Sequence, residues 1–183
     1  AIVPNEGNGT FAEAVLDARS IGATAAQFVV DWRHYENNTD GAFDPPDGQN
    51  FIDIVNGFYA VGTTYAAPLV VYVSVIDTVS RRVPPDLEGV SWNSTAMRDR
   101  FAAFQTQLFA RLYAVRVASY AIGNEVDVYM GSRGGAAGAE WAQFKAFFAF
   151  AAEHARQTRA LQRAPTGGDA ADAAPLPVSC KFT

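Results

Sequence analysis

Short apolar runs alternate along this chain with longer segments of helical period, and this alternation limits the possible folds more than any other feature. Three runs are rich in β-branched and aromatic residues and are bounded by turn residues. They cover residues 27–32, 68–76 and 115–122. Continuous rather than alternating apolarity is typical of strands covered on both faces, as in parallel sheets. We therefore predict buried parallel strands over these three segments.

Four segments carry apolar stripes at helical spacing, which predicts amphipathic helices that pack on the sheet. Thr10 and Glu13 form a capping-box pattern before the first helix, and Asn50 is the expected N-cap of the second. The aromatic side chains of the stripes are expected to belong to the core. The stripes are Phe11, Ala14, Val15, Ala18 and Ile21; Phe51, Ile54, Val55 and Phe58; Phe101, Phe104, Leu108, Leu112 and Val115; and Trp141, Phe144, Phe148, Ala151 and Ala155.

The order of these elements predicts an α/β fold with a parallel sheet. If Ile2 and Val3 form a first short strand, four βα units follow one another, and such alternation implies right-handed crossovers. We assign residues 1–162 to this domain. Residues 163–183 form a tail rich in Ala, Gly and Pro, in which residues 176–182 are either a fifth strand or a loose end.

Charge and composition exclude several classes of function. The 183 residues carry a net charge of −5, which argues against binding to nucleic acid or to an anionic membrane surface. No apolar run reaches the length of about 18 residues that a transmembrane helix needs. The lone Cys180 and the two histidines form no metal-binding spacing, so no metal is expected. No cofactor is expected either, because nucleotide-binding glycine motifs are missing and Glu6 would repel a phosphate near the first strand.

Each predicted strand is followed by at least one carboxylate. Ligands of parallel α/β sheets bind outside the carboxyl ends of the strands, so these groups are expected to share one rim and to form a site. The carboxylates that follow the four strands are Glu6, Asp31, Asp77 and Glu125. Their neighbours in sequence are Trp32, Arg33 and His34 after the second strand, and Asn124, Asp127 and Tyr129 around the end of the fourth.

Paired carboxylates of this kind suit the hydrolysis of a glycosidic bond. The glycosidic oxygen is a poor leaving group, and a carboxylic acid with a raised pKa can supply the proton that it needs. A second carboxylate must lie across the bond. A separation of about 5–5.5 Å gives retention of configuration, whereas about 6.5–9.5 Å admits a water molecule and gives inversion.

The segment Ile122-Gly123-Asn124-Glu125 resembles the end of the fourth strand in clan A glycoside hydrolases, which are retaining (β/α)8-barrel enzymes. The resemblance covers residues 10–160 and includes residues 21–32, which are similar to the first helix and second strand of these enzymes. It implies that Glu125 is the acid/base and that Asn124 contacts the sugar 2-hydroxyl. Trp32, Trp92 and Tyr129 would then stack on sugar rings, and Arg33, His34 and Asp127 would be further substrate contacts.

The chain departs from this family in its number of βα units. A complete barrel takes about 250 residues, and the family nucleophile ends a seventh strand that is missing here. Three hypotheses remain: two half-barrels pair as a homodimer, which we favour; the chain is a piece of a longer enzyme; or it is a non-catalytic carbohydrate-binding module. The second carboxylate would come from the partner copy or from Glu6, Asp31 or Asp77. A secreted or periplasmic location is preferred over a cytoplasmic one.

Overall fold

A parallel β-sheet forms the centre of the molecule, as predicted. The computed structural model describes residues 10–36, 43, 51–163 and 174–181. The strands follow the order β1-β2-β4-β5 with parallel neighbours, and the short β3 pairs antiparallel with the end of β2. The fold class is therefore α/β. The strands are β1 (Ala26–Asp31), β2 (Leu69–Asp77), β3 (Ser80–Arg81), β4 (Val117–Asn124) and β5 (Val178–Ser179).

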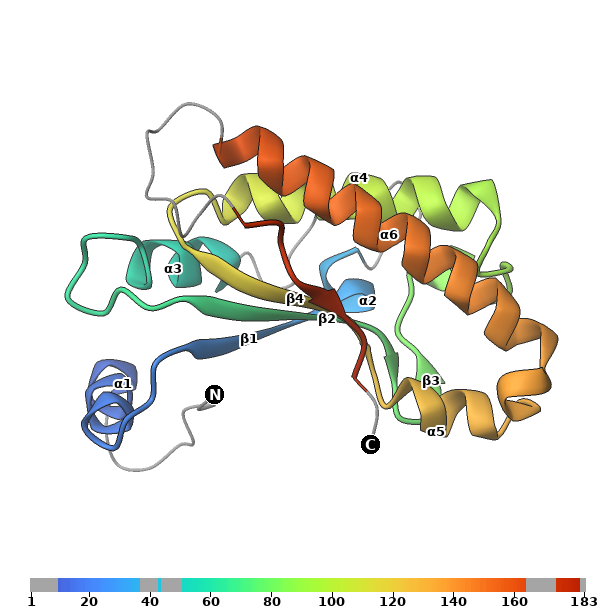
Figure 1. The fold of residues 1–183 in the computed structure, drawn as a ribbon, viewed down its shortest axis with the longest axis horizontal. Coiled ribbons are helices and arrows are strands. Elements are labelled where there is room, and N and C mark those ends of the chain that lie inside the picture. The colour runs from blue at the N-terminus through green and yellow to red at the C-terminus, as the bar shows by residue number, and fades with distance from the viewer. Residues whose placement is uncertain (1–9, 37–42, 44–50, 164–173, 182–183) are drawn as a thin grey trace.

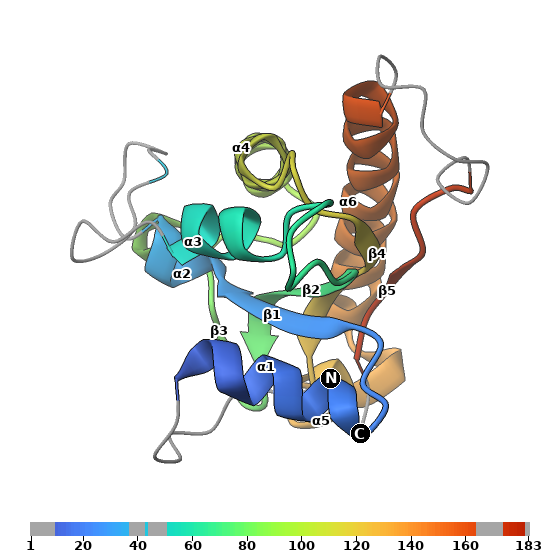
Figure 2. The same cartoon turned by 90° about the vertical axis from the view of Figure 1, so that its left-hand side faces the viewer.

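Helices connect the parallel strands, and α4 and α6 lie side by side against the sheet (Figures 1 and 2). The carboxyl ends of the strands point towards β3 and α5 in Figure 1, and α1 lies at the opposite, amino end. The helices are α1 (Phe11–Ser20), α2 (Trp32–Tyr35), α3 (Phe51–Phe58), α4 (Thr95–Arg111), α5 (Val126–Gly131) and α6 (Ala139–Arg163), with the 3₁₀ turns η2 (Pro85–Leu87) and η3 (Gly135–Ala137).

The tail contributes a strand to the sheet. Tyr120 of β4 lies opposite Val178 of β5, and the Tyr120 amide donates a hydrogen bond of 2.9 Å to the carbonyl of Pro177. Of the two alternatives for residues 176–182, the fifth strand is therefore the one found. The first strand expected at Ile2 and Val3 lies outside the described residues. The strand order that is described is consistent with one half of a (β/α)8 barrel.

The aromatic stripe of α4 is buried, as predicted, and meets aromatic rings of α2 and α6. Phe101 packs edge-on against Trp32 of α2 with ring centroids 4.8 Å apart, and it contacts Phe147 of α6 at 5.1 Å. Trp92 contacts Phe144 of α6 at 5.2 Å. Each fully buried phenyl ring contributes roughly 1.5–3 kcal/mol from its removal from water. This cluster holds α2, α4 and α6 together beneath the strand ends.

The predicted buried stripes of α1 and α3 are only partly confirmed. The Thr10–Glu13 capping box is present at α1, but Phe11 and Ile21 at the ends of its stripe are exposed. In α3 the buried apolar residues are Ile52 and Val55, whereas the predicted Phe51 and Ile54 are about half exposed. Apolar residues stand on nearly all sides of this short helix, so its sequence offers two possible inward faces and the contact with the sheet selects one. Asn50 lies outside the described residues.

Candidate active site

The strands β1, β2 and β4 end at the same edge of the sheet (Figure 1), and each ends in a polar residue where the sequence predicts a site. Asp31 ends β1, Asp77 ends β2 and Asn124 ends β4. The strand register sets Asp77 directly opposite Asn124. We call these three residues, together with Thr78 and Glu125, the strand-end cluster.

Two hydrogen bonds join β2 to β4 within the strand-end cluster. The Asn124 amide Nδ2 donates to Oδ1 of Asp77 at 3.0 Å. The Thr78 hydroxyl donates to Oε2 of Glu125 at 2.7 Å. Each strand thus orients a side chain of the other, and the Glu125 carboxylate is held at the rim rather than extended freely into solvent.

Both members of the Thr78–Glu125 pair adopt left-handed backbone conformations. Each has a φ of +51°, and they are the only non-glycine residues with positive φ in the part of the chain that the structure describes. Thr78 is the first loop residue of the β2–β3 hairpin, a position where glycine is common because it costs no strain. Such conformations cost of order 1–3 kcal/mol each and cluster at functional sites. The surrounding fold therefore keeps Thr78 and Glu125 in strained conformations, and in these conformations their side chains are hydrogen-bonded.

Gly123 directs the chain into this arrangement. Its φ is +86°, and a Cβ added there would lie 2.7 Å from Cγ2 of Val126, which is fully buried. A larger residue at 123 would therefore be strained in its backbone and would clash with the first turn of α5. The glycine before Asn124 and Glu125 is thus required by the turn that presents them.

Asp31 is already engaged by the protein. Its Oδ2 accepts a hydrogen bond of 2.8 Å from Nε of Arg82, and its Oδ1 caps the short helix α2 through the amide of His34 at 3.4 Å. The His34 side chain is exposed beside it. Asp31 consequently lies at the predicted rim but serves there as a cap and an ion-pair partner.

The two tryptophans expected to stack on sugars belong to the core instead. Trp32 and Trp92 are fully buried. Their indole N–H groups donate to carboxylates, Trp32 to Glu36 at 2.8 Å and Trp92 to Glu140 at 3.0 Å. The prediction that they stack on sugars is therefore wrong. An indole ring is apolar enough to be buried in the core when a buried or half-buried acceptor is present for its N–H group.

Tyr129 is also buried, and its ring is covered. The guanidinium of Arg133 lies 3.7 Å from the ring centroid, and the hydroxyl donates to Glu140 at 2.9 Å. Burial raises the pKa of this hydroxyl. Tyr129 thus lies close to the rim, as predicted, but it supports other side chains rather than offering a bare ring face to a sugar.

Glu140, at the start of α6, is a site residue that the sequence analysis missed. Partial burial raises the pKa of its carboxyl, but hydrogen bonds from Arg81, Tyr129 and Trp92 outweigh this effect, so the pKa lies below the ordinary value of 4.5. Arg81 donates to Glu140 at 2.9 Å and lies 4.3 Å from the ring centroid of Trp92. Its partner stands 59 positions away in sequence, so no local spacing indicated the pair.

A large open pocket lies over this group. Its volume is about 870 Å³, and most of its lining is polar. Three arginines, from α2, β3 and the segment after α5, reach it together with two glutamates. We call it the arginine pocket; its charged residues are Arg33, Arg81, Arg133, Glu88 and Glu140. Arg33 was a predicted site residue, whereas the other four were not.

Two further predicted residues have different outcomes. Asp127 lies half-buried in the first turn of α5, two residues after Glu125. Desolvation raises the pKa of the Cys180 thiol, and the charge of Asp127 raises it further. Asp127 therefore belongs to the carboxyl edge of β4, on the side where the tail returns. Glu6 lies outside the described residues.

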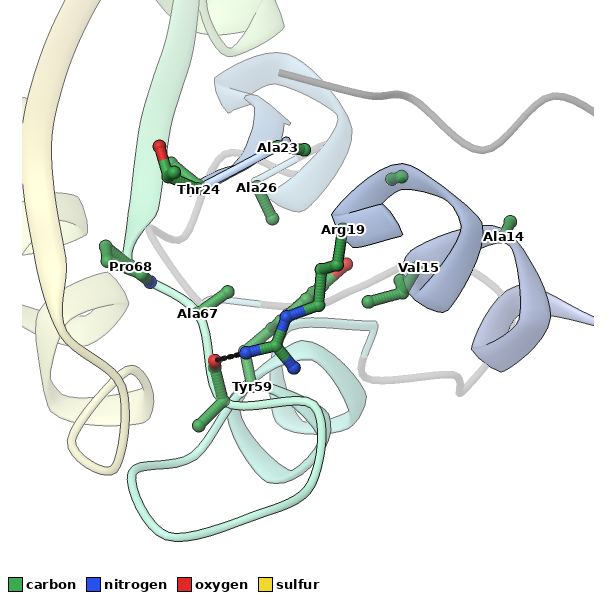
Figure 3. A pocket seen from close by; sticks show the side chains of 12 residues that line it. Ala14, Val15, Arg19, Ala23, Thr24, Ala26, Tyr59, Ala67 and Pro68 are labelled. Carbon is green, nitrogen blue, oxygen red and sulfur yellow. Dashed lines mark hydrogen bonds between the residues drawn. The ribbon is translucent and has the colours of Figure 1, made fainter. Parts of the chain in front are cut away.

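A second, smaller pocket of about 310 Å³ lies at the opposite end of the sheet, between α1 and the starts of β1 and β2 (Figure 3). Alanines form much of its wall. Arg19 crosses it and donates to the carbonyls of Thr64 at 2.7 Å and Ala66 at 3.3 Å. In (β/α) barrels this amino face is associated with stability rather than catalysis, so the strand-end cluster remains the candidate site.

Comparison with known proteins adds no family to this description. Neither a scan against protein-family models nor a search of curated proteins finds a match to this chain. Within residues 10–36, 43, 51–163 and 174–181, no three His, Cys, Asp or Glu side chains are grouped to hold a metal ion. In the same part of the chain, no helix has the length and hydropathy of a membrane span.

Proposed function

We propose that this protein hydrolyses β-glycosidic bonds at the strand-end cluster, with Glu125 as the general acid/base and Asn124 as a substrate contact. The observation that carries the proposal is the pairing of Glu125 with Thr78. Two non-glycine residues with left-handed backbones meet through a hydrogen bond of 2.7 Å at the carboxyl ends of adjacent strands. Evolution has little reason to keep such strain for stability alone, since an unstrained turn would be more stable.

The chemistry proposed for Glu125 follows from its surroundings. Its carboxyl group is only partly buried, and its hydrogen-bond partner among the described residues is the neutral Thr78 hydroxyl, so a ligand at the rim can reach it. In its protonated form it would donate to the glycosidic oxygen as the bond breaks, and as a carboxylate it would then activate water. The Thr78 hydroxyl would hold one oxygen in place through both steps.

The second carboxylate is proposed to come from Asp77 or from a second copy of the chain. Asp77 is exposed and accepts a hydrogen bond from the side-chain amide of Asn124, the residue that ends β4 and precedes Glu125. Asp31 is a weaker candidate because Arg82 neutralises it. A homodimer of half-barrels would bring a second strand-end cluster to the same rim. This assembly is part of the proposal.

Replacement of Glu125 by Gln tests the proposal. Gln preserves the shape of the side chain and its capacity to accept from Thr78, but it cannot titrate. Hydrolysis of a panel of aryl β-glycosides should fall about 100-fold or more in Glu125→Gln. Glu153→Gln is the matched control because Glu153 is exposed on α6 and contacts Gln157 and Arg156 rather than the rim. Equal activity of Glu125→Gln and the parent protein would refute the assignment.

Non-catalytic carbohydrate binding is the second candidate function. Two carboxylates of the rim favour it, because Asp31 accepts a hydrogen bond from Arg82 and Asp77 accepts one from Asn124. Both groups are therefore already bound within the protein. Under this alternative the parent protein would bind oligosaccharides without turning over any glycoside in the panel. The same preparation of protein therefore decides between the two functions.

A further inference from the structure

We propose that the arginine pocket binds an oxyanion carried by a sugar, so that the ligand is an acidic saccharide bearing a carboxylate or a sulfate. The inference deepens the proposed function and rests on it for the statement that the ligand is a saccharide. The binding of the oxyanion itself depends on Arg33, Arg81 and Arg133 and not on the catalytic role of Glu125.

Arg133 has hydrogen-bonding capacity to spare. Its Nη1 donates to the Ser132 hydroxyl at 3.1 Å and weakly to the Tyr129 carbonyl at 3.4 Å, while its Nε lies 3.4 Å from Glu140. Among the described residues, its Nη2 meets no acceptor. The ring of Tyr129 below the guanidinium fixes the plane of the fork. A ligand oxygen would therefore meet an oriented donor rather than a freely moving side chain.

Arg33 faces the same pocket from α2 and also has unused donors. It pairs through Nη1 with Glu88, and among the described residues its Nε and Nη2 have no acceptor. The pair is exposed, with 41% of the Arg33 side chain and 52% of the Glu88 side chain accessible to solvent. Exposed pairs of this kind contribute little to stability, so a ligand anion can replace Glu88 at small cost.

Arg81 forms the floor of the pocket. Its guanidinium is mostly buried and donates to Glu140, to the Tyr129 hydroxyl and to the carbonyls of Glu88 and Val90. With these contacts it is fixed in place and adds positive potential rather than a free donor. Three arginines face two glutamates in the lining, which leaves an excess of one positive charge in a protein whose net charge is −5. The first turn of α6, which also lines the pocket, adds the positive end of its dipole.

This arrangement selects for the charge of a ligand. A guanidinium binds the two oxygens of a carboxylate, or two oxygens of a sulfate, through parallel N–H donors, and such bonds are stronger than those to neutral hydroxyls. A neutral sugar would leave the excess charge uncompensated. The volume of about 870 Å³ is large enough for a sugar ring rather than a bare ion.

Binding of methyl β-glucuronide and methyl β-glucoside tests the inference, because the two probes differ only in the carboxylate at C6. Glucose 6-sulfate forms a third arm, which separates a carboxylate from a sulfate preference. Dissociation constants are measured by titration calorimetry at low ionic strength. We expect the parent protein to bind the glucuronide or the sulfate at least tenfold more tightly than the glucoside.

Substitutions in the arginine pocket should change the affinity for the charged probe in opposite directions, depending on the charge that is removed. Arg33→Gln and Arg133→Gln should each weaken binding of the charged probe about tenfold, whereas Glu88→Gln should strengthen it several-fold because it releases Arg33. Arg156→Gln changes the net charge by the same amount but stands 17 residues beyond the start of α6, about 25 Å along the helix. It should leave the affinities unchanged. All four side chains are at least partly exposed, so each variant is expected to fold, which circular dichroism checks.

Equal affinity for glucuronide, sulfate and glucoside would overturn the inference, as would equal losses in Arg156→Gln and Arg133→Gln. Failure of all probes to bind would overturn it as well. These outcomes are distinct from failure of the proposed function: if Glu125→Gln hydrolyses glycosides like the parent but charged probes still depend on Arg33 and Arg133, the acid/base assignment is wrong and the oxyanion site stands.

Discussion

Glu125 and Glu140 show how differently two carboxylates near the strand ends are held. Glu125 accepts one hydrogen bond, from a neutral hydroxyl at the rim. Glu140 accepts from a guanidinium, a phenol and an indole, and this set of donors lowers its pKa below 4.5 despite partial burial. Glu125 is thus open to a ligand at the rim, whereas Glu140 is bound by three side chains of the protein and fixes the pocket around it.

The lowered pKa of Glu140 predicts a specific dependence of stability on acid. A carboxyl whose folded pKa is below its unfolded value stabilises the fold above about pH 4.5, and this contribution is lost as the pH falls through the folded pKa. Glu140→Gln should lower the free energy of unfolding by about 2 kcal/mol at pH 7 and flatten its decline below pH 5. Urea denaturation across this range measures both effects, with Glu153→Gln as control. A decline as steep in Glu140→Gln as in the parent would contradict the assignment.

For the helices, residues near in sequence determine where a helix begins, whereas tertiary contacts determine which of its faces is buried. The amino end of α1 is set by its own residues: the Thr10 amide donates to the Glu13 carboxylate at 2.6 Å, and the Glu13 amide donates to the Thr10 hydroxyl at 3.3 Å. The inward face of α3 is set from outside, because its apolar residues permit more than one face. The start of α1 can therefore be predicted from its capping residues, whereas the buried face of α3 cannot be predicted from its own sequence.

Thr10→Ala should destabilise α1 by about 1 kcal/mol because it removes the capping acceptor. Thr10→Ser, which keeps the hydroxyl, should retain most of the stability. Amide hydrogen exchange within α1 is the appropriate measurement, since a single helix can open without global unfolding. Exchange in Thr10→Ala as slow as in Thr10→Ser would show that packing, rather than the capping box, holds this helix.

Within the part of the chain that the structure describes, some of the sheet is uncovered. In the described residues, β1 pairs only with β2 and β5 only with β4, so the sheet has two open edges. Val29 of β1 is 49% exposed, and its partner in register, the half-buried Tyr72, lies on the same face. Open edges beside exposed apolar side chains favour association with another chain. This supports the proposed pairing of two half-barrels.

We therefore expect a dimer in size-exclusion chromatography with light scattering, and Val29→Lys should shift it to monomer by placing charges in the interface. Val61→Lys is the matched control, because Val61 is 77% exposed in the loop after α3, near the amino ends of the strands. It should leave the dimer intact. A parent protein that is monomeric at micromolar concentration would refute the assembly.

Local patterns in the sequence determined the strands β1, β2 and β4, the start of α1, the buried stripe of α4 and the presence of carboxylates at the strand ends. These features depend on residues close together in the chain, so spacing and capping predict them. Tertiary structure alone decided that Trp32 and Trp92 turn inward, that Thr78 meets Glu125, and that Arg81 and Glu140 form one network beneath an open pocket. Each of these contacts either joins residues distant in sequence or buries a side chain that would otherwise be in contact with water. Their energies therefore exist only after the strands and helices have packed.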